Sequence, residues 1–545
     1  SFKAYFNVPA ATYGKLSVVI TTEGHTASLD LTTDGIELLP GELAYTTKAV
    51  SGWTALEPEL SVTWETNPTF EPVEITNDMK GKCNIVINAP AGIKAFTVSM
   101  LSDYLNNDIG LTELDLLNPQ GLETIFDMLN FPYGEKILNQ KTVPFDLTNA
   151  VALLEGKSGQ HIFTMNVTDN NNKTINQDIT FFVPEAISAT VSDIDLWKNT
   201  ATITLNNAPE GATVQYKRST ESEWKNTTKN PNGTFSITPS WITEENDAGK
   251  TVYSLDNNCG VFAGATYDWQ ILNGEAVVAS GTFETSAGDP IENGDMSQWC
   301  ETKEMLPLFG SKKITVWYPG SSWSDSTPGF WDSSNNAGNK TACTQDKTKN
   351  ASCAWLQASG VSLVGALASG SLFTGTFTYA NMNGTASFGQ KYKYTARPTA
   401  LRLKYHATLG TVNYNKHNGP LEKDKDIMDQ CSFTVCIVDW DTRHDVQSGT
   451  SAPKGIWDPI TMGELPVDKQ NGIIGYGVKY SSENTPGTDL IPLEIPIKYY
   501  QQTNAAPDGE NKFTIIISVS TSRYGDYLNG CDKNKIYVDD FEWVY

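Results

Sequence analysis

The sequence predicts an all-β protein of several domains. Short runs alternate apolar and polar residues, as in Ile162-Phe-Thr-Met-Asn-Val167 and Thr200-Ala-Thr-Ile-Thr-Leu205. Successive side chains of a β-strand point to opposite faces, so this period of two is typical of half-buried strands. Gly, Pro, Asn and Asp interrupt the runs at short intervals, which is typical of β-sandwiches. A chain of 545 residues is long enough for three to five domains.

The first two domains are predicted from a change in composition and a hairpin pattern. A Pro-rich stretch at 67–72 closes an N-terminal β domain over residues 1–68. The segment 69–184 ends with two strand-like runs around a polar turn at 169–173, which resembles the last hairpin of bacterial immunoglobulin-like repeats. We therefore expect an immunoglobulin-like sandwich, with a helical insertion at the amphipathic stretches 120–130 and 147–154.

The third domain is predicted over residues 185–287, ahead of a linker-like stretch at 286–294. The runs Thr213-Val-Gln-Tyr-Lys-Arg218 and Gly264-Ala-Thr-Tyr-Asp-Trp-Gln-Ile271 resemble those of fibronectin type III modules. In that fold a tyrosine corner bonds its hydroxyl to upstream backbone, and Tyr267 stands at the matching position. Such modules commonly act as spacers.

The fourth domain, 288–545, carries the most specific resemblance. Its ordered blocks include Asn293-Gly-Asp-Met-Ser-Gln-Trp299, Pro328-Gly-Phe-Trp-Asp-Ser-Ser-Asn335 and Ile536-Tyr-Val-Asp-Asp-Phe-Glu-Trp-Val-Tyr545. They resemble the putative carbohydrate metabolism domain of Bacteroidetes surface lipoproteins. The first and last blocks also resemble jelly-roll carbohydrate-binding modules. The resemblance therefore implies a jelly-roll β-sandwich that binds carbohydrate.

A metal site follows from the same two blocks. The first and last strands of a sandwich lie close together, and Ca²⁺ prefers carboxylate and carbonyl oxygens. We therefore expect one structural calcium at Asp295, Asp539 and Asp540. Ser297 stands where the modules place a glutamate, which weakens this set. The alternative is that these carboxylates cap backbone amides of the loops.

The composition limits the partners of the protein. A formal net charge of −24 disfavours nucleic acid and anionic lipid, whereas a neutral glycan is not repelled. No apolar run reaches the roughly 18 residues that a transmembrane helix needs. We expect a monomer that is exported to the outer-membrane surface or beyond, and the sequence leaves open whether a lipid anchor precedes Ser1.

Candidate sugar-contacting residues are aromatic and polar side chains in loop-like sequence. Aromatic faces stack on the apolar C–H faces of sugar rings, and polar neighbours bind the hydroxyls. Three clusters of the fourth domain have this character, at 317–332, 439–457 and 523–530. The candidates are Trp317, Tyr318, Trp323, Trp331, Trp440, Trp457, Arg523, Tyr524 and Tyr527. The alternative is that these rings pack beneath the loops.

Catalysis is the less favoured hypothesis. Glycoside hydrolysis needs two carboxylates, one of them with a raised pKa. Among 63 acidic residues the sequence singles out no pair, and Asp439, Asp441 and Asp526 are the weak candidates. The predicted function is glycan binding by the jelly roll, in glycan capture or metabolism. A glycoside hydrolase and a cell-adhesion or stalk protein are the alternatives.

Overall fold

The computed structural model describes residues 59–305, 314–324, 327–337, 342–362, 364–380, 383–416, 419–421, 426–449 and 453–545. It also gives the backbone of an antiparallel hairpin, β1 (Ser17–Thr22) and β2 (His25–Asp30). An N-terminal β domain was predicted over 1–68. Apart from this hairpin, its residues up to 58 lie outside the described residues. Strands account for 46% of the structure and helices for 7%, which confirms the all-β prediction.

The chain divides into two compact units, Ser1–Ala186 (unit 1) and Ile187–Tyr545 (unit 2). Unit 1 packs a three-stranded sheet against a five-stranded sheet around one apolar core. The first sheet contains, in order, β3 (Ser61–Trp64), β5 (Asn84–Asn88) and β8 (Thr142–Asp146). The second contains β4 (Val73–Glu74), β10 (Thr174–Val183), β9 (Gly159–Asp169), β6 (Ile93–Leu101) and β7 (Glu113–Asp115). The short helices are η1 (Tyr104–Ile109), α1 (Glu123–Leu129), η2 (Gly134–Lys136) and α2 (Thr148–Ala152).

Unit 2 begins with two four-stranded sheets that face each other. One contains β11 (Ser188–Asp195), β12 (Thr200–Asn206), β16 (Phe235–Ile237) and β15 (Thr228–Lys229). The other contains β14 (Lys225–Asn226), β13 (Thr213–Arg218), β19 (Thr266–Asn273) and β20 (Ala276–Glu284). The Tyr267 hydroxyl accepts a hydrogen bond of 2.8 Å from the backbone N–H of Phe262, five residues upstream. The predicted tyrosine corner is therefore confirmed.

The rest of unit 2 is a larger sandwich, the C-terminal sandwich, and its first sheet has ten strands. In order they are β17 (Trp241–Glu245), β18 (Thr251–Leu255), β35 (Lys498–Tyr499), β33 (Ile473–Ser481), β31 (Cys431–Trp440), β36 (Phe513–Ser520), β28 (Ser371–Ala380), β29 (Asn383–Phe388) and β32 (His444–Gly449), with β23 (Trp331–Asp332) beside β28. We call this the large sheet. The two strands β17 and β18 come from the segment that was predicted as the third domain.

The second sheet of the C-terminal sandwich has five strands. They are β24 (Thr344–Asp346), β25 (Cys353–Gln357), β37 (Lys535–Val544), β30 (Ala400–Thr408) and β34 (Ile491–Pro496). Its inner face packs on that of the large sheet, and the core contains Leu403 and Val538 opposite Val435, Ile437 and Ile517. The smaller elements are β21 (Trp299–Met305), β22 (Ile314–Pro319), η3 (Ser334–Ala337), β26 (Ser359–Val361), β27 (Ala366–Ala368), α3 (Val467–Asn471) and η4 (Gly525–Tyr527).

A buried cation joins the two parts of unit 2. Arg397 is fully buried, and its guanidinium lies 4.6 Å from the Trp197 ring, 5.3 Å from the Trp241 ring and 5.0 Å from the Tyr499 ring. It donates to the carbonyl oxygens of Trp197 (2.7 Å) and Asn504 (3.2 Å). A planar guanidinium can stack and donate at once, which a lysine cannot do. Burial lowers the Arg397 pKa from its usual value.

Membrane-spanning helices were also sought. Within the part of the chain that the structure describes, no helix combines the length and the apolar character needed to cross a bilayer.

We expect the substitution Arg397→Ala to destabilise unit 2 by about 3 kcal/mol, because it opens a cavity among three rings and leaves buried carbonyls unpaired. Denaturant unfolding of the full chain, followed by tryptophan fluorescence, measures this loss. Arg402→Ala is the matched control. Its side chain is 45% exposed and pairs with Glu494 and Glu542, so we expect less than about 1 kcal/mol. Equal losses for the two variants would contradict a stabilising role for the buried cation.

Candidate functional site

The outer face of the large sheet is a regular array of side chains. On β31, Phe433 and Val435 point into the core, so Ser432 and Thr434 point outward. Directly opposed residues of neighbouring strands share a face. Ser432 thus lies between Tyr480 of β33 and Ser520 of β36, and Thr434 lies beside Ser518. The pairing carries this polar face across three central strands.

One half of this outer face is covered, and no described segment lies over the other half. The segment 453–472, which includes α3, lies over the end of β31 that contains Cys436, Val438 and Trp440. Trp457 packs edge-on against Trp440 at 5.6 Å and against His444 at 6.0 Å. The uncovered half forms a pocket of about 760 Å³. Its floor is the large sheet, and its walls include Trp457 on one side and the segment 523–528 on another.

Aromatic rings line the walls and the far floor of the pocket. The Arg523 guanidinium lies 3.7 Å from the Tyr480 ring centroid and 5.1 Å from that of Tyr524. Tyr527 meets Tyr524 edge-on at 6.4 Å. Arg523 is held in place by Gln430, whose side-chain oxygen accepts from its guanidinium at 3.1 Å. Phe373, Phe377, Tyr379 and Phe388 complete the aromatic lining.

Hydroxyl groups dominate the central floor. No described residue hydrogen-bonds to the side chains of Ser432, Thr434 or Ser518, and all three line the pocket. Burial raises the pKa of Tyr480 to about 12, which keeps this phenol protonated and able to donate. A hydroxyl both donates and accepts, so such a floor suits a ligand that is itself rich in hydroxyls.

Of the residues that the structure describes, three with carboxyl groups line the pocket, Asp458, Glu464 and Asp526. Asp458 is occupied locally, since it accepts from the backbone N–H groups of Ile460 and Thr461 at 2.8 and 2.9 Å. Asp526 has no hydrogen-bond or ion-pair partner among the described residues, and burial raises its pKa to about 6. Burial also raises the pKa of Tyr527, and the nearby charges of Glu464 and Asp526 raise it further. Asp526 is thus the carboxyl that is free to meet a ligand.

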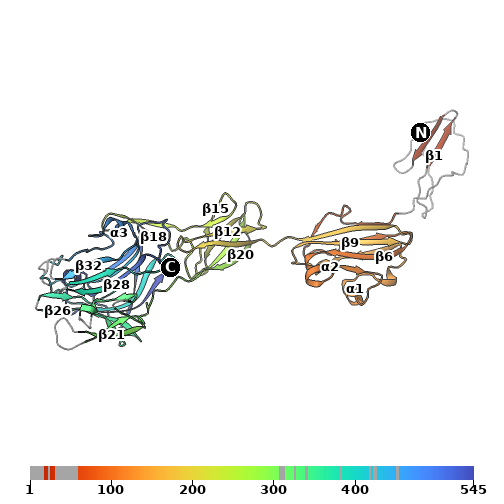
Figure 1. Ribbon diagram of the computed structural model, residues 1–545. Helices are drawn as coiled ribbons and strands as arrows, with labels where there is room; N and C mark the ends of the chain where they lie inside the picture. The colour runs from red at the N-terminus through yellow and green to blue at the C-terminus, as the bar shows by residue number, and fades with distance from the viewer. Residues whose placement is uncertain are drawn as a thin grey trace. The chain divides into compact units, whose positions relative to one another are not determined.

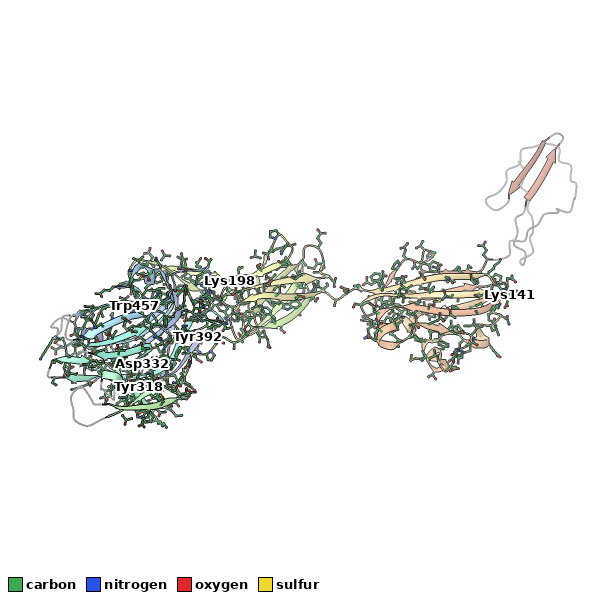
Figure 2. All side chains as sticks on the ribbon, viewed as in Figure 1. Lys141, Lys198, Tyr318, Asp332, Tyr392 and Trp457 are labelled. Atoms are coloured by element: carbon green, nitrogen blue, oxygen red, sulfur yellow. The ribbon has the colours of Figure 1, made fainter. Side chains whose placement is uncertain are left out.

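The pocket brings together one group of the predicted residues. Trp457, Arg523, Tyr524, Tyr527 and Asp526 all line it, although 66 residues separate Trp457 from Arg523. The other sugar-binding candidates lie outside its lining, and two of them are not buried. Trp317 on β22 is 37% exposed, and Trp323 stacks on the Tyr318 ring at 4.0 Å. Figure 2 shows Trp457 and Tyr318 well apart in unit 2.

The prediction that all these rings face solvent is wrong for Tyr318, Trp331 and Trp440, which are buried. Trp331 packs on Phe541 at 5.0 Å, and its indole N–H donates to the carbonyl of Glu292. The Trp440 indole N–H donates to the carbonyl of Lys469, beneath α3. Loop-like neighbours in the sequence describe the backbone, and they do not fix which way a large ring points. These three rings have no face for a sugar.

The remaining candidate acids lie away from the pocket. Asp439 and Asp441 approach the Lys512 ammonium at 3.1 and 3.8 Å, at the far end of β31. Asp439 also has a buried carboxylate oxygen without a partner. Neither residue lines the pocket, so the three catalytic candidates do not form one site.

The predicted calcium ligands are engaged with protein groups. The buried Asp539 accepts from the Asn350 amide at 2.6 Å and from the Asp540 N–H at 2.9 Å, and its pKa is raised to about 6, first by burial. Asp540 pairs with Lys404 at 2.8 Å, and Asp295 accepts from Ser297. No group of three metal-binding side chains occurs among the described residues. These contacts follow the capping alternative, and the calcium stays a prediction.

The sequence reasoning missed the floor of the pocket. Ser432, Thr434 and Ser518 alternate with core residues, and that alternation was visible. Polar alternation is, however, typical of any solvated sheet face, so it could not single these residues out without the pairing of the strands.

We expect Asp526→Asn to stabilise the protein at pH 7.5 by about 1–2 kcal/mol, because a partly buried charge is removed. The folded pKa of about 6 lies above the unfolded value of about 3.9. The group therefore favours folding below pH 4, and this contribution is lost as the pH rises through 6. Thermal unfolding at pH 7.5 and pH 4 should show the gain only at pH 7.5. Asp441→Asn, at an exposed carboxyl, should change neither value.

The chain was compared with known families and solved structures. Residues 283–544 match the family described as "Putative carbohydrate metabolism domain". A structure described as a putative glycoside hydrolase from Bacteroides thetaiotaomicron shares 14% identity over 62% of this chain and 98% of its own, with a TM-score of 0.30. A second, from Bacteroides vulgatus, shares 16% identity over 46% of this chain and 96% of its own, with a TM-score of 0.31.

A structure of carbohydrate-binding modules from the β-sandwich superfamily shares 8% identity over 89% of this chain and 97% of its own, with a TM-score of 0.14. No curated protein matches the chain. Residues 283–544 are thus a carbohydrate-related domain that matches the putative carbohydrate metabolism domain family, the family that the ordered sequence blocks predicted.

Proposed function

We propose that the protein binds a neutral glycan in the pocket on the outer face of the large sheet. One observation carries the proposal. The uncovered half of that face collects aromatic rings and hydroxyls without described partners into a single pocket of about 760 Å³. That volume lies within the usual range of ligand pockets, roughly 300–1,000 Å³.

The lining suits the two surfaces of a sugar. The faces of a pyranose are rows of C–H groups, which pack on rings such as Tyr524 and Trp457. The edges carry hydroxyls, which would exchange hydrogen bonds with Ser432, Thr434 and Ser518. An unpartnered Asp526 carboxylate would accept from one or two sugar hydroxyls, and charge-assisted hydrogen bonds are among the stronger ones.

Charge favours a neutral ligand over an acidic one. Among the described residues, Asp458, Glu464 and Asp526 line the pocket together with one cation, Arg523, and the chain as a whole carries a formal net charge of −24. Uronate or sulfate groups would be repelled by the carboxylates of the pocket and by the net charge of the chain. We further propose that the protein acts as an exported protein at the outer-membrane surface, where polymeric glycans are met.

We expect Tyr524→Ala to weaken glycan binding by about 10- to 100-fold, because a ring at an interface centre commonly contributes 1–3 kcal/mol. Affinity electrophoresis of the full chain in gels that contain hydroxyethyl cellulose, galactomannan, laminarin or polygalacturonate measures this. Trp317→Ala is the matched control, since that exposed ring lies outside the pocket lining. Binding to polygalacturonate alone, or equal losses in the two variants, would refute the proposal.

A glycoside hydrolase is the second candidate, and Asp526 favours it. A carboxyl with a pKa of about 6 in a pocket could act as a general acid toward a glycosidic oxygen. Glu464, which also lines the pocket and whose charge acts on Tyr527, is the second carboxyl that the mechanism would need.

If the protein is a hydrolase, Asp526→Asn should lower reducing-sugar release from the bound polysaccharide by about 10²- to 10⁴-fold, because the proton donor is lost. Release is measured on each neutral polysaccharide that the wild-type chain retains in the gels. Asp441→Asn should leave the rate unchanged. Retention of a glycan without any release by the wild-type chain would leave binding as the function.

A further inference from the structure

The hairpin of β17 and β18 leaves the part of the chain in which it arises. It is inserted between β16 and β19, which belong to the two four-stranded sheets of the fibronectin-like part. It pairs with neither of those sheets. Instead Tyr253 of β18 pairs with Tyr499 of β35, which makes the hairpin the edge of the large sheet. Figure 1 shows β18 among the strands of the C-terminal sandwich and apart from β12 and β20.

Apolar and ionic contacts hold the hairpin on the sheet. Trp241 meets the Tyr499 ring edge-on at 5.9 Å, and both rings lie near the Arg397 guanidinium. Glu244 pairs with Lys498 at 3.1 Å. Val252 is fully buried in the cluster that lies under the segment 453–472, together with Met462 and Leu465. The hairpin therefore packs against the segment that forms one wall of the pocket.

A hydrogen-bond chain runs from the tip of the hairpin to that wall. The buried Asn246 uses its side-chain oxygen within the turn, where it accepts from the N–H of Lys250 at 3.0 Å. Its amide nitrogen donates to the hydroxyls of Tyr476 and Tyr500, at 3.0 Å each. The Tyr500 hydroxyl in turn donates to the carbonyl of Pro459 at 2.7 Å. Pro459 follows Trp457 and Asp458, and all three line the pocket.

Because both hydroxyls receive a hydrogen bond from the same nitrogen, position 246 requires an amide. An aspartate would keep the turn but lose both donor bonds. The arrangement fixes the phenol of Tyr500, which contacts the wall through its hydrogen bond to the carbonyl of Pro459.

We propose that the hairpin of the fibronectin-like part is a positioning element of the pocket, acting through Asn246 and Tyr500 on the wall that contains Trp457. The smallest unit with a complete pocket is then residues 187–545, and the fibronectin-like part is more than a spacer. The expected effect of the hairpin on glycan affinity rests on the proposed function. Its expected effect on the order of the wall does not.

Two tyrosines of the same network give a matched test in the full chain. Tyr500→Phe removes the donor to Pro459, whereas Tyr476→Phe removes a hydroxyl for which no bond to the wall is described. Each variant costs Asn246 one acceptor. We expect amide hydrogen exchange over 456–464 to rise about fivefold or more in Tyr500→Phe, the factor that corresponds to one ordinary hydrogen bond. Tyr476→Phe should stay within twofold of the wild type.

The second measurement is retention in the neutral-glycan gels. We expect Tyr500→Phe to weaken binding about fivefold, with a melting temperature equal to that of Tyr476→Phe. Asn246→Ala should reproduce the change in exchange and binding. Equal exchange over 456–464 in the two tyrosine variants would overturn the inference. A wild-type chain that binds no glycan would overturn the proposed function instead, and the exchange comparison would still decide the role of the hairpin.

Discussion

The alternation of side chains along β31, β33 and β36 is the constraint on which the site depends. Each strand must give one face to the core of the C-terminal sandwich, as Val435 and Ile517 do. The other face is then free of that requirement, and the pairing register carries it across neighbouring strands. Where the segment 453–472 covers it, this face is apolar. Where nothing described covers it, the same strands present serine, threonine and tyrosine. The same strand register therefore places the apolar residues that support the wall and the polar residues that form the floor of the pocket.

Local patterns predicted the elements better than the site. The hairpin of β9 and β10, the short helices α1 and α2 and the tyrosine corner at Tyr267 all depend on neighbours within a few residues, and the sequence showed them. The predictions for Trp331 and Trp440 were wrong because the direction in which a large side chain points is set by strands that are distant in the sequence. The same limit applies to Arg397, whose stacking partners include Trp197 and Tyr499 from far along the chain. Only the folded register could join Trp457 with the segment 523–528.

The division of the chain into domains illustrates the same point. A linker-like composition at 286–294 suggests a joint, yet the contacts on either side of it form one compact unit, Ile187–Tyr545. Local composition indicates where the backbone is exposed to solvent. It cannot predict that the hairpin 241–255 pairs with the edge of another sheet, because that pairing joins residues far apart in the sequence.

The short strand at the edge of the large sheet explains why the fibronectin-like part supplies this hairpin. β35 contains only Lys498 and Tyr499, which is too short to shield the edge of β33. An unpaired edge in a sheet of this size invites pairing with other chains. The hairpin ends the sheet with β17 as a short outer strand that carries Glu244 and Glu245, two charges of the kind that discourage such pairing. Once the hairpin is there, its tip reaches Tyr476 and Tyr500, so an element that protects an edge is also placed to hold the wall of the pocket.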